Sequence, residues 1–418
     1  MPAPERISLT YLSSTEIPKG SSVPLKTGKS EGPLSLEVSE LSGAVFQPDT
    51  NSPGRGILRA VGDKTKVAER NPIDGAKSDK PQNAIFDFKL ELTGNKLSLE
   101  PISAIPIDVQ NYRAKLEDFS GLKLPGKFIP DYAWDTEDMV QLSDGRTIVS
   151  MEGFDEKHKP GGEKFPRVGS GIAILDQAGK ITSLLALPEE FQPTESINPD
   201  GTTKLVSGQR PNLGLEAAGL TEDGKTLFVG MESPLVQDGP LPNFKEGATT
   251  RILKFALETN GEFKLSPNQI KYKLEPIPTI EPAPVLEEKC DNGLVDILPL
   301  SSDRFLSMER ATIFFEDGRV RNSVRIYDIE LGENGTIKSK REAFNSKSLE
   351  SQLEISPAPV GKAQPGKLPP GGQRSENFEG MEFGPLTEKG ERTVLIVGDD
   401  NARDNQRTLV VALKLEGK

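Results

Sequence analysis

The sequence predicts an all-β fold, a single β-propeller for which five blades are favoured and six are the alternative. Three observations support this prediction: one hairpin pattern recurs along the chain, further strand-like segments follow most copies, and turn-forming residues are abundant. Gly and Pro number 40 and 34 among the 418 residues, and long stretches of helix-forming residues are missing. This composition is typical of many short strands joined by tight turns.

The recurring hairpin consists of an acidic or small polar residue, an apolar strand, a polar turn, a second apolar strand and another acidic residue. Its copies span residues 41–64, 137–153, 216–233, 295–310 and 379–401. Two of the turns read Asp-Gly, the strongest short hairpin signal. Internal repetition of this kind is the sequence signature of propellers and solenoids.

Two more strand-like segments follow most copies, for example 170–176 with 180–188, and four antiparallel strands form a propeller blade. The last copy is followed by one clear strand, 408–415. We therefore expect residues 6–13 to pair with this strand and close the ring, which removes open sheet edges. Residues 1–418 are predicted to form one domain, with the closing strand and a loop in 1–40 and the blades in 41–418.

The repeat interval of roughly 80–90 residues exceeds the ~40–45 of a minimal blade, and long insertions account for the surplus. In a propeller, the loops that join strand two to strand three, and one blade to the next, lie on one face. Loops gathered on one face of a rigid scaffold often carry function. Most of the insertions are expected on this face. The insertions span 71–83, 154–169, 189–213, 233–250, 276–292 and 345–376.

Each hairpin also places its polar residues at the end opposite the turn. Two residues of an antiparallel hairpin face each other when their numbers average to the centre of the turn. By this rule the expected facing pairs are Ser42 with Asp63, Glu137 with Glu152, Glu216 with Glu232, Asp296 with Glu309, and Glu379 with Asp399.

Innermost strands line the channel of a propeller, so these acidic residues should converge near its mouth. Many carboxylates cannot share a small volume in ionised form unless some bind protons or a cation binds. Oxygen donors without His or Cys favour Ca²⁺, with Mg²⁺ as the alternative. The interpretation without a metal is that these residues cap loops or pair with arginines. The candidates are Asp63, Glu137, Asp138, Glu152, Glu216, Glu232, Asp296, Glu309, Glu379, Asp399 and Asp400, with amide oxygens from Asn212, Asn292, Asn377 and Asn401.

Basic side chains lie next to these acidic positions. They could clamp a phosphate or a carboxylate of a substrate, or serve only as salt-bridge partners. These residues are Lys64, Arg210, Arg310, Arg374 and Arg403.

Composition and charge exclude several classes of function. The formal net charge is −12, which argues against nucleic acid as a partner. The single cysteine, Cys290, excludes an internal disulfide, and the single histidine, His158, excludes a histidine-rich metal centre. A Ser-His-Asp enzyme would depend on His158 alone, so we do not expect that mechanism. No apolar run approaches the ~20 residues that cross a bilayer.

Four segments carry a resemblance to a known family: 212–239, 306–310 (LSMER), 377–384 (NFEGMEFG) and 397–401 (VGDDN). In order and spacing they resemble the phytase-like esterase domain, which typically shows Asn-Arg-Gly-x-Glu-Gly, a Pro-Asp-Gly turn with Glu-Ser-Pro-Leu, then Leu-x-x-Glu-Arg, Asn-x-Glu-Gly and a terminal Asp-Asp-Asn. The likeness covers the chain from about residue 40 onward. Leu213 stands where the family often has a basic residue and Ala217 where it has Gly, so no phosphate contact is carried over to position 213.

The resemblance implies a propeller and suggests hydrolysis of phosphate monoesters or related esters. We expect a monomer that binds a small anionic or ester substrate. It also implies export, to an extracellular or periplasmic location. The first residues lack the apolar core of a signal peptide, so a cytoplasmic protein and one whose leader is absent from this chain stay open as alternatives. Two other functions also stay open: a non-catalytic propeller that binds a ligand or protein, and a lactonase-like calcium propeller.

The expected site therefore combines three sets of residues. The catalytic set is Glu232, Glu309 and Arg310, with Arg310 as the anion clamp. The metal ligands are drawn from Asp63, Glu137, Glu152, Glu216, Glu379, Asp399 and Asp400. The substrate-binding set is Arg210, Asn212, Asn377 and Asn401.

Overall fold

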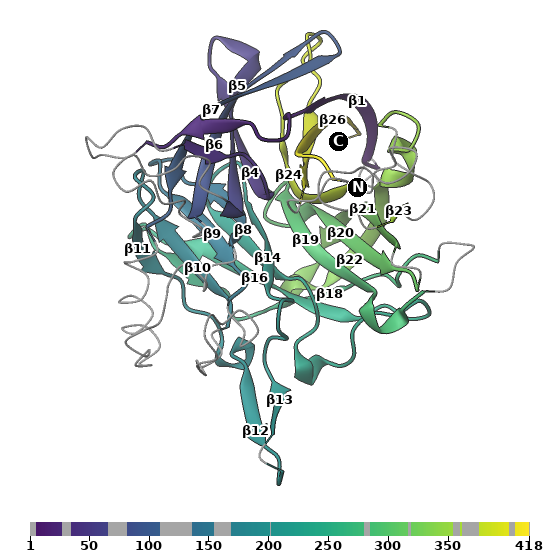
Figure 1. Cartoon of the computed structure of the whole chain (residues 1–418). Coiled ribbons are helices and arrows are strands. Elements are labelled where there is room, and N and C mark those ends of the chain that lie inside the picture. Colours follow the sequence, from purple (N-terminus) through teal and green to yellow (C-terminus); the bar gives the residue numbers. More distant parts are fainter. Residues whose placement is uncertain are drawn as a thin grey trace, which may run out of the picture.

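The structure is a computed structural model that describes residues 6–26, 35–65, 82–108, 136–153, 169–200, 202–279, 285–316, 319–353, 360–361, 376–400 and 406–417. Five antiparallel sheets form the blades of a propeller (Figure 1). The first blade contains β4 (Leu41–Asp49), β5 (Ser52–Thr65), β6 (Gln82–Thr93) and β7 (Lys96–Pro106), and the second contains β8 (Thr136–Gln141), β9 (Thr147–Met151), β10 (Gly171–Leu175) and β11 (Ile181–Leu184).

The third and fourth blades each have an additional short strand. Blade three contains β14 (Leu215–Leu220), β15 (Thr226–Met231), β16 (Thr249–Leu257) and β17 (Phe263–Leu265), with β18 (Ile270–Lys273) also paired to β16. Blade four contains β19 (Asp291–Pro299), β20 (Arg304–Phe314), β21 (Arg319–Leu331) and β22 (Ile337–Asn345), with β23 (Val360–Gly361) also paired to β21.

The fifth blade joins the two ends of the chain. It contains β24 (Asn377–Phe383), β25 (Thr393–Asp399), β26 (Leu409–Glu416) and the N-terminal β1 (Ser8–Glu16). β1 runs antiparallel to β26, with Leu9 opposite Leu415, and Figure 1 shows both ends of the chain beside this blade. The predicted closure of the ring by the N-terminal strand is confirmed, and so is the count of five blades.

Two small hairpins and several short 3₁₀ turns complete the described elements. The hairpins are β2 (Ser22–Pro24) with β3 (Ser35–Glu37), and β12 (Thr194–Ile197) with β13 (Thr203–Ser207), the second of which extends away from the blades in Figure 1. The turns are η3 (Glu189–Phe191), η4 (Val236–Asp238), η5 (Glu287–Lys289), η6 (Glu333–Gly335) and η7 (Ser346–Leu349). Among the described residues, no helix is long and apolar enough to cross a membrane.

The hydrophobic core lies between neighbouring blades. Consecutive residues of a strand point to opposite faces of its sheet, so Leu227 of β15 packs toward blade two and Phe228 packs toward blade four. The rings of Phe228 and Phe305 lie 5.4 Å apart across the second of these contacts. Because both faces of a blade are covered in this way, its middle strands are apolar almost throughout.

The innermost strands β4, β8, β14, β19 and β24 contact one another in ring order and surround the channel. Their turns have the expected chemistry, since Gly145 and Gly224 of the two Asp-Gly turns have φ of +88° and +70°, a region that glycine enters without strain. The open ends of the hairpins all lie at the other end of the channel, where strand two leads to strand three and one blade leads to the next.

The predicted facing pairs are wrong by one or two residues. All five inner hairpins contain a register shift near the open end, between Leu41 and Ala44 in the first blade and at the corresponding places in the others. In blade four, Asp296 therefore faces Met308, and Glu309 faces Leu294. A β-bulge inserts an extra residue into one strand, so counting outward from the turn fails beyond it.

Candidate functional site

Three carboxylates meet at the open end of the hairpins of blades two and three. Glu137 lies in the bulge of β8, Glu152 directly follows β9, and Glu216 lies in the bulge of β14. One carboxylate oxygen of each residue lies within 4.8 Å of one oxygen of each of the other two, and Glu152 and Glu216 are buried. The structure thus brings together three of the seven residues predicted to bind a metal.

Main-chain and side-chain contacts hold Glu152 in place. Its Oε1 accepts a 2.8 Å hydrogen bond from the backbone N–H of Gly214. Its backbone carbonyl accepts hydrogen bonds from Ser170 Oγ, at 3.0 Å, and from Gln209 Nε2, at 2.5 Å. A Cβ atom at position 214 would lie 2.7 Å from Cγ of Glu152, so glycine is required there for the carboxylate to approach.

The donor set fits a hard divalent cation. Oxygens that bind one Ca²⁺ lie about 2.3–2.6 Å from it, so two of them can be at most about 5 Å apart. The separation of up to 4.8 Å among the three carboxylates satisfies this limit. A bound cation would offset the mutual repulsion of these three carboxylates.

Arg310 links two further carboxylates at the same mouth. Its Nη2 donates to Oε1 of Glu232 at 3.0 Å, and its Nη1 donates to Glu379 and, at 3.3 Å, to Oδ1 of Asn377. Arg310 lies on β20 of blade four, between Glu232 of blade three and Glu379 of blade five. The predicted anion clamp is therefore already engaged with carboxylates of the protein itself.

Burial and neighbouring charges shift the pKa values of several groups at this mouth. Burial raises the pKa of Glu232 from its ordinary value to about 7, although Arg310 acts to lower it. Burial also raises the pKa of the neighbouring Asp291. Burial alone would lower the pKa of Arg310, but the carboxylates around it, Glu232 first and Glu216 next, raise it above its ordinary value.

A second acidic group belongs to blade five. Asn377 donates from Nδ2 to Asp399 Oδ2 at 3.4 Å, and Asp400 Oδ1 accepts from the backbone N–H of Glu40 at 3.1 Å. Asp399 and Asp400 are both buried. Among the described residues, neither belongs to the group of converging carboxylates formed by Glu137, Glu152 and Glu216.

Two predicted substrate-binding residues have local structural contacts. Arg210 donates to the backbone carbonyls of Pro234 and Gly239, at 3.1 and 2.6 Å, and so holds the loop around η4. Asn212 is exposed and has φ of +54°, a left-handed conformation that Asn tolerates better than most residues. The turn it forms leads directly into Gly214 and the acidic mouth.

Some of the predicted residues lie outside what the structure describes. Asn401, Arg374, Arg403 and His158 are outside the described residues, and the side chains of Asp63 and Lys64 are outside the described part of β5. The predicted insertions 71–83, 154–169 and 345–376 also fall largely outside.

Glu309 belongs to a different network from Arg310, its neighbour in the chain. Its Oε1 accepts from Tyr272 at 2.8 Å and from Lys340 Nζ at 2.6 Å, and its Oε2 accepts from Asn292 Nδ2 at 2.8 Å. The side chain of Glu309 is 0% exposed. Because consecutive strand residues point to opposite faces, Glu309 lies between blades three and four, while Arg310 reaches the mouth.

Asp138 and Asp296, the remaining acidic candidates, lie deeper in the channel and are 2% and 1% exposed. Their side chains hydrogen-bond to each other. Burial is the main cause that raises the pKa of both carboxyls well above their ordinary range.

Sequence reasoning missed Asp291 and the glycines that make room for the acidic side chains. Asp291 precedes the predicted fourth hairpin, and its charge acts on Arg310. A Cβ atom at Gly293 would lie 2.3 Å from Cγ of Glu232. The motif Gly-x-Glu at 214–216 was visible in the sequence, but its glycine contacts a carboxylate of the preceding blade.

Residues 38–402 match the family described as "Phytase-like: Esterase-like activity of phytase". The chain belongs to this family. The match covers blades one to four, strands β24 and β25 of blade five, and the acidic mouth, whereas β1 and β26 lie outside it. Membership of a family named for esterase-like activity supports a propeller hydrolase. No curated protein matches the sequence significantly.

Several solved structures have a similar course of the chain at low identity. They include the N-terminal domain of Nup159 (11% identity, 98% of this chain and 96% of that chain, TM-score 0.33). A Penicillium chrysogenum α-L-arabinanase (11%, 96% and 98%, TM-score 0.35) and a periplasmic gluconolactonase of Pseudomonas aeruginosa (12%, 97% and 96%, TM-score 0.30) are also similar. These values are too low to support an inference about this chain.

Proposed function

We propose that this phytase-like propeller is a metal-dependent hydrolase of phosphate monoesters or related esters, acting at its acidic mouth. The observation that carries the proposal is the convergence of Glu137, Glu152 and Glu216, whose oxygens lie within 4.8 Å of one another. Family membership supports hydrolysis, and the oxygen donors support a hard cation, Ca²⁺ before Mg²⁺.

Glu137, Glu152 and Glu216 would hold the cation. A bound divalent cation neutralises the charge of an anionic substrate and lowers the pKa of a bound water. The hydrogen bond from Gly214 fixes the orientation of Glu152, so this ligand is in position before a cation binds. An anionic substrate would need this cation, because the guanidinium of Arg310 is engaged by Glu232 and Glu379.

Glu232 is the residue best suited to move a proton at this mouth. Its pKa of about 7 lies near neutral pH, where a general acid or base is most effective. One of its oxygens, Oε1, accepts from Arg310, and the other would exchange a proton with the substrate or with water. Arg310 would act as a positioning residue for Glu232 and Glu379.

Turnover of matched chromogenic substrates tests the proposal. We expect the chain to hydrolyse an aryl phosphate or an aryl acyl ester in Ca²⁺, to lose that activity in a chelator, and to recover it when Ca²⁺ is restored. Glu216→Gln should abolish the activity, whereas Glu258→Gln, which changes an exposed carboxylate paired with Lys264, should retain it. Turnover of a lactone alone would favour a lactonase, and no turnover above that of Glu216→Gln would favour a binding propeller.

A further inference from the structure

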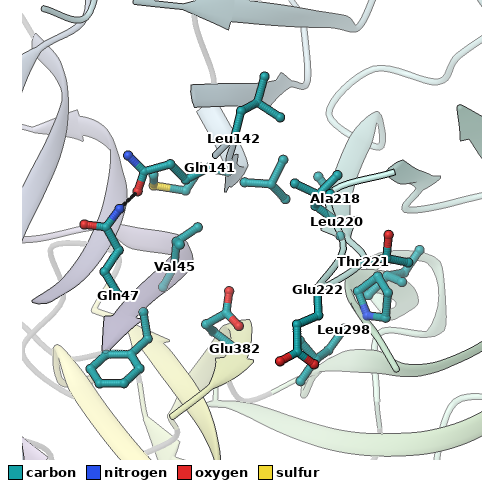
Figure 2. Close-up of a pocket in the computed structure, with 18 of the residues that line it drawn as sticks. Val45, Gln47, Gln141, Leu142, Ala218, Leu220, Thr221, Glu222, Leu298 and Glu382 are labelled. Atoms are coloured by element: carbon teal, nitrogen blue, oxygen red, sulfur yellow. Dashed lines mark hydrogen bonds between the residues drawn. The ribbon is translucent and has the colours of Figure 1, made fainter. Parts of the chain in front are cut away.

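A cavity occupies the channel at the end opposite the acidic mouth, where the turns of the inner hairpins meet. Its volume is about 570 Å³, within the range of about 300–1,000 Å³ typical of small-molecule sites. Figure 2 shows its lining, to which several blades contribute. Apolar residues, among them Val45, Leu142, Ala218 and Leu298, form much of the wall.

Glu382, on β24, projects into this cavity (Figure 2). Its Oε1 accepts from the backbone N–H of Phe383 at 2.5 Å, and Figure 2 shows the carboxylate directed into the cavity. Glu382 also lines an adjoining cavity of about 780 Å³ that opens beside Phe383 and Arg392. The carboxylate is thus within reach of a ligand in either space.

The charges around Glu382 are mainly negative. The described residues that line the first cavity include Glu222 and Asp223 but no Lys, Arg or His. In the adjoining cavity, Arg392 pairs with Glu222 at 3.6 Å and lies over the ring of Phe383 at 4.0 Å. Both contacts engage its guanidinium, although its charge also acts to lower the pKa of Glu382.

The carboxyl pair in the middle of the channel adds to this negative field. Asp138 and Asp296 directly precede Met139 and Ile297, which line the cavity. Burial raises the pKa of Glu382 to about 8, and the charge of Asp138 contributes. The charge of Arg392 offsets these effects only in part, so a cationic ligand would further stabilise the ionised carboxylate.

We propose that this turn-side cavity is a binding site for an organic cation, an ammonium group carried on an apolar body, with Glu382 as its counter-ion. The apolar walls accommodate the body of the ligand, and the ammonium group donates to the carboxylate of Glu382. This site lies at the opposite end of the channel from the acidic mouth and does not depend on hydrolysis there.

Calorimetric titration of the full chain with three ligands of one shape tests the proposal. The probes are 4-phenylbutylamine, the neutral 4-phenylbutan-1-ol and the anionic 4-phenylbutyrate, at pH 8.5. A hydrogen bond to a charged group favours the amine over the alcohol by about tenfold or more. We expect the butyrate to bind most weakly. Equal affinity for the three probes, or a preference for the butyrate, would overturn the proposal.

Three variants locate the binding. Glu382→Gln should reduce the preference for the amine to about twofold or less, because a neutral amide replaces the counter-ion. Glu216→Gln, at the acidic mouth, should leave the preference unchanged, and its loss there would assign amine binding to the mouth instead. Leu220→Trp narrows the cavity and leaves Glu382 itself unaltered, so it should weaken the binding of amine and alcohol alike. With this variant the cavity can still be tested if Glu382→Gln does not fold. Unchanged binding in both Glu382→Gln and Leu220→Trp would refute the site.

Discussion

Asp138 and Asp296 hydrogen-bond to each other across the central channel, from blades two and four, which are not neighbours in the ring. Each carboxyl also reaches a further blade: Asp138 Oδ2 accepts from the N–H of Ala218 at 2.6 Å, and Asp296 accepts from the N–H of Met381. Two buried carboxyls in contact hold a shared proton, because both cannot be ionised. One proton thus helps to hold four blades together.

The first prediction concerns the pH dependence of stability. Burial raises the pKa of both carboxyls above the ordinary value of 3.8, so the folded protein holds the shared proton more tightly than the unfolded chain. The stability from this proton is fully present below about pH 4 and is lost as the pH rises through the folded pKa. Asp138→Asn removes one titrating group and one backbone hydrogen bond, at a cost of about 1–3 kcal/mol in the free energy of unfolding at pH 4. We expect this deficit to shrink toward pH 8.

Urea unfolding of both proteins at pH 4, 6 and 8 measures this difference. The matched control is Asp144→Asn, in the exposed turn of the same hairpin, where hydrogen bonds from Arg146 lower the pKa of Asp144. The stability gap of this control should widen slightly as the pH rises, the opposite sign. A deficit of Asp138→Asn that stays constant or grows with pH would contradict the shared proton.

The second prediction is that Ca²⁺ stabilises the propeller through its acidic mouth. A ligand that binds only the folded state at a hundred times its Kd stabilises it by about 2.7 kcal/mol. We expect the Tm to rise with Ca²⁺ and to fall in a chelator, and Glu152→Gln to lose this response. Glu100→Gln, at an exposed position of β7, should keep it. The same Tm with and without Ca²⁺ in the unaltered protein would remove the metal from the proposed mechanism.

The third prediction concerns the coupling between Arg310 and Glu232. Because the charge of Arg310 lowers the pKa of Glu232 against the effect of burial, Arg310→Gln should raise that pKa above about 7. NMR titration of ¹³C-labelled glutamate carboxyls in chelator-treated protein measures the change without requiring turnover. Arg392→Gln, far from this mouth, should leave the Glu232 signal unchanged. A pKa that stays the same or falls in Arg310→Gln would show that the pair does not set it.

The sequence predicted the ring of blades because each hairpin carries its own signals. The Asp-Gly turns, the alternation of apolar residues and the lone last strand depend only on nearby residues. The pairing register of the inner hairpins could not be predicted in this way, because each bulge depends on packing between blades. For example, a Cβ at Gly43 would lie 1.7 Å from Oδ1 of Asp138 in the next blade. The sequence of a single hairpin does not predict such contacts.

The same difference between signals within a hairpin and contacts between blades explains why only part of the candidate site was predicted. The position of Glu137, Glu152 and Glu216 at the open ends followed from the hairpins alone. The different environments of Glu309 and Arg310 depend on which face of β20 meets which neighbouring blade. The exposure of Glu382 to the turn-side cavity depends on how all the inner strands close around the channel, which no local pattern indicates.

The fourth prediction tests Glu309 as a structural residue. Lys340 is 13% exposed and donates to Glu309, which is 0% exposed, and its ammonium group lies 4.6 Å from the ring centre of Tyr272. Without Lys340, Glu309 keeps Arg325 as a cationic partner at 3.9 Å, and loss of a hydrogen bond to a buried charged group costs about 1.5–3 kcal/mol. We expect Lys340→Met to lower the free energy of unfolding by this amount and to leave the activity per folded molecule unchanged.

Lys338→Met is the matched control, on the same strand and two residues earlier. Lys338 is 61% exposed and pairs with Glu330 at the surface, where such a pair contributes about 0–1 kcal/mol. Denaturant unfolding and the activity of the folded fraction, measured on both variants, separate the two roles of Glu309. Equal stability losses in the two variants would show that the buried network does not hold blades three and four together. A loss of turnover in stable, folded Lys340→Met would instead support the predicted catalytic role of Glu309.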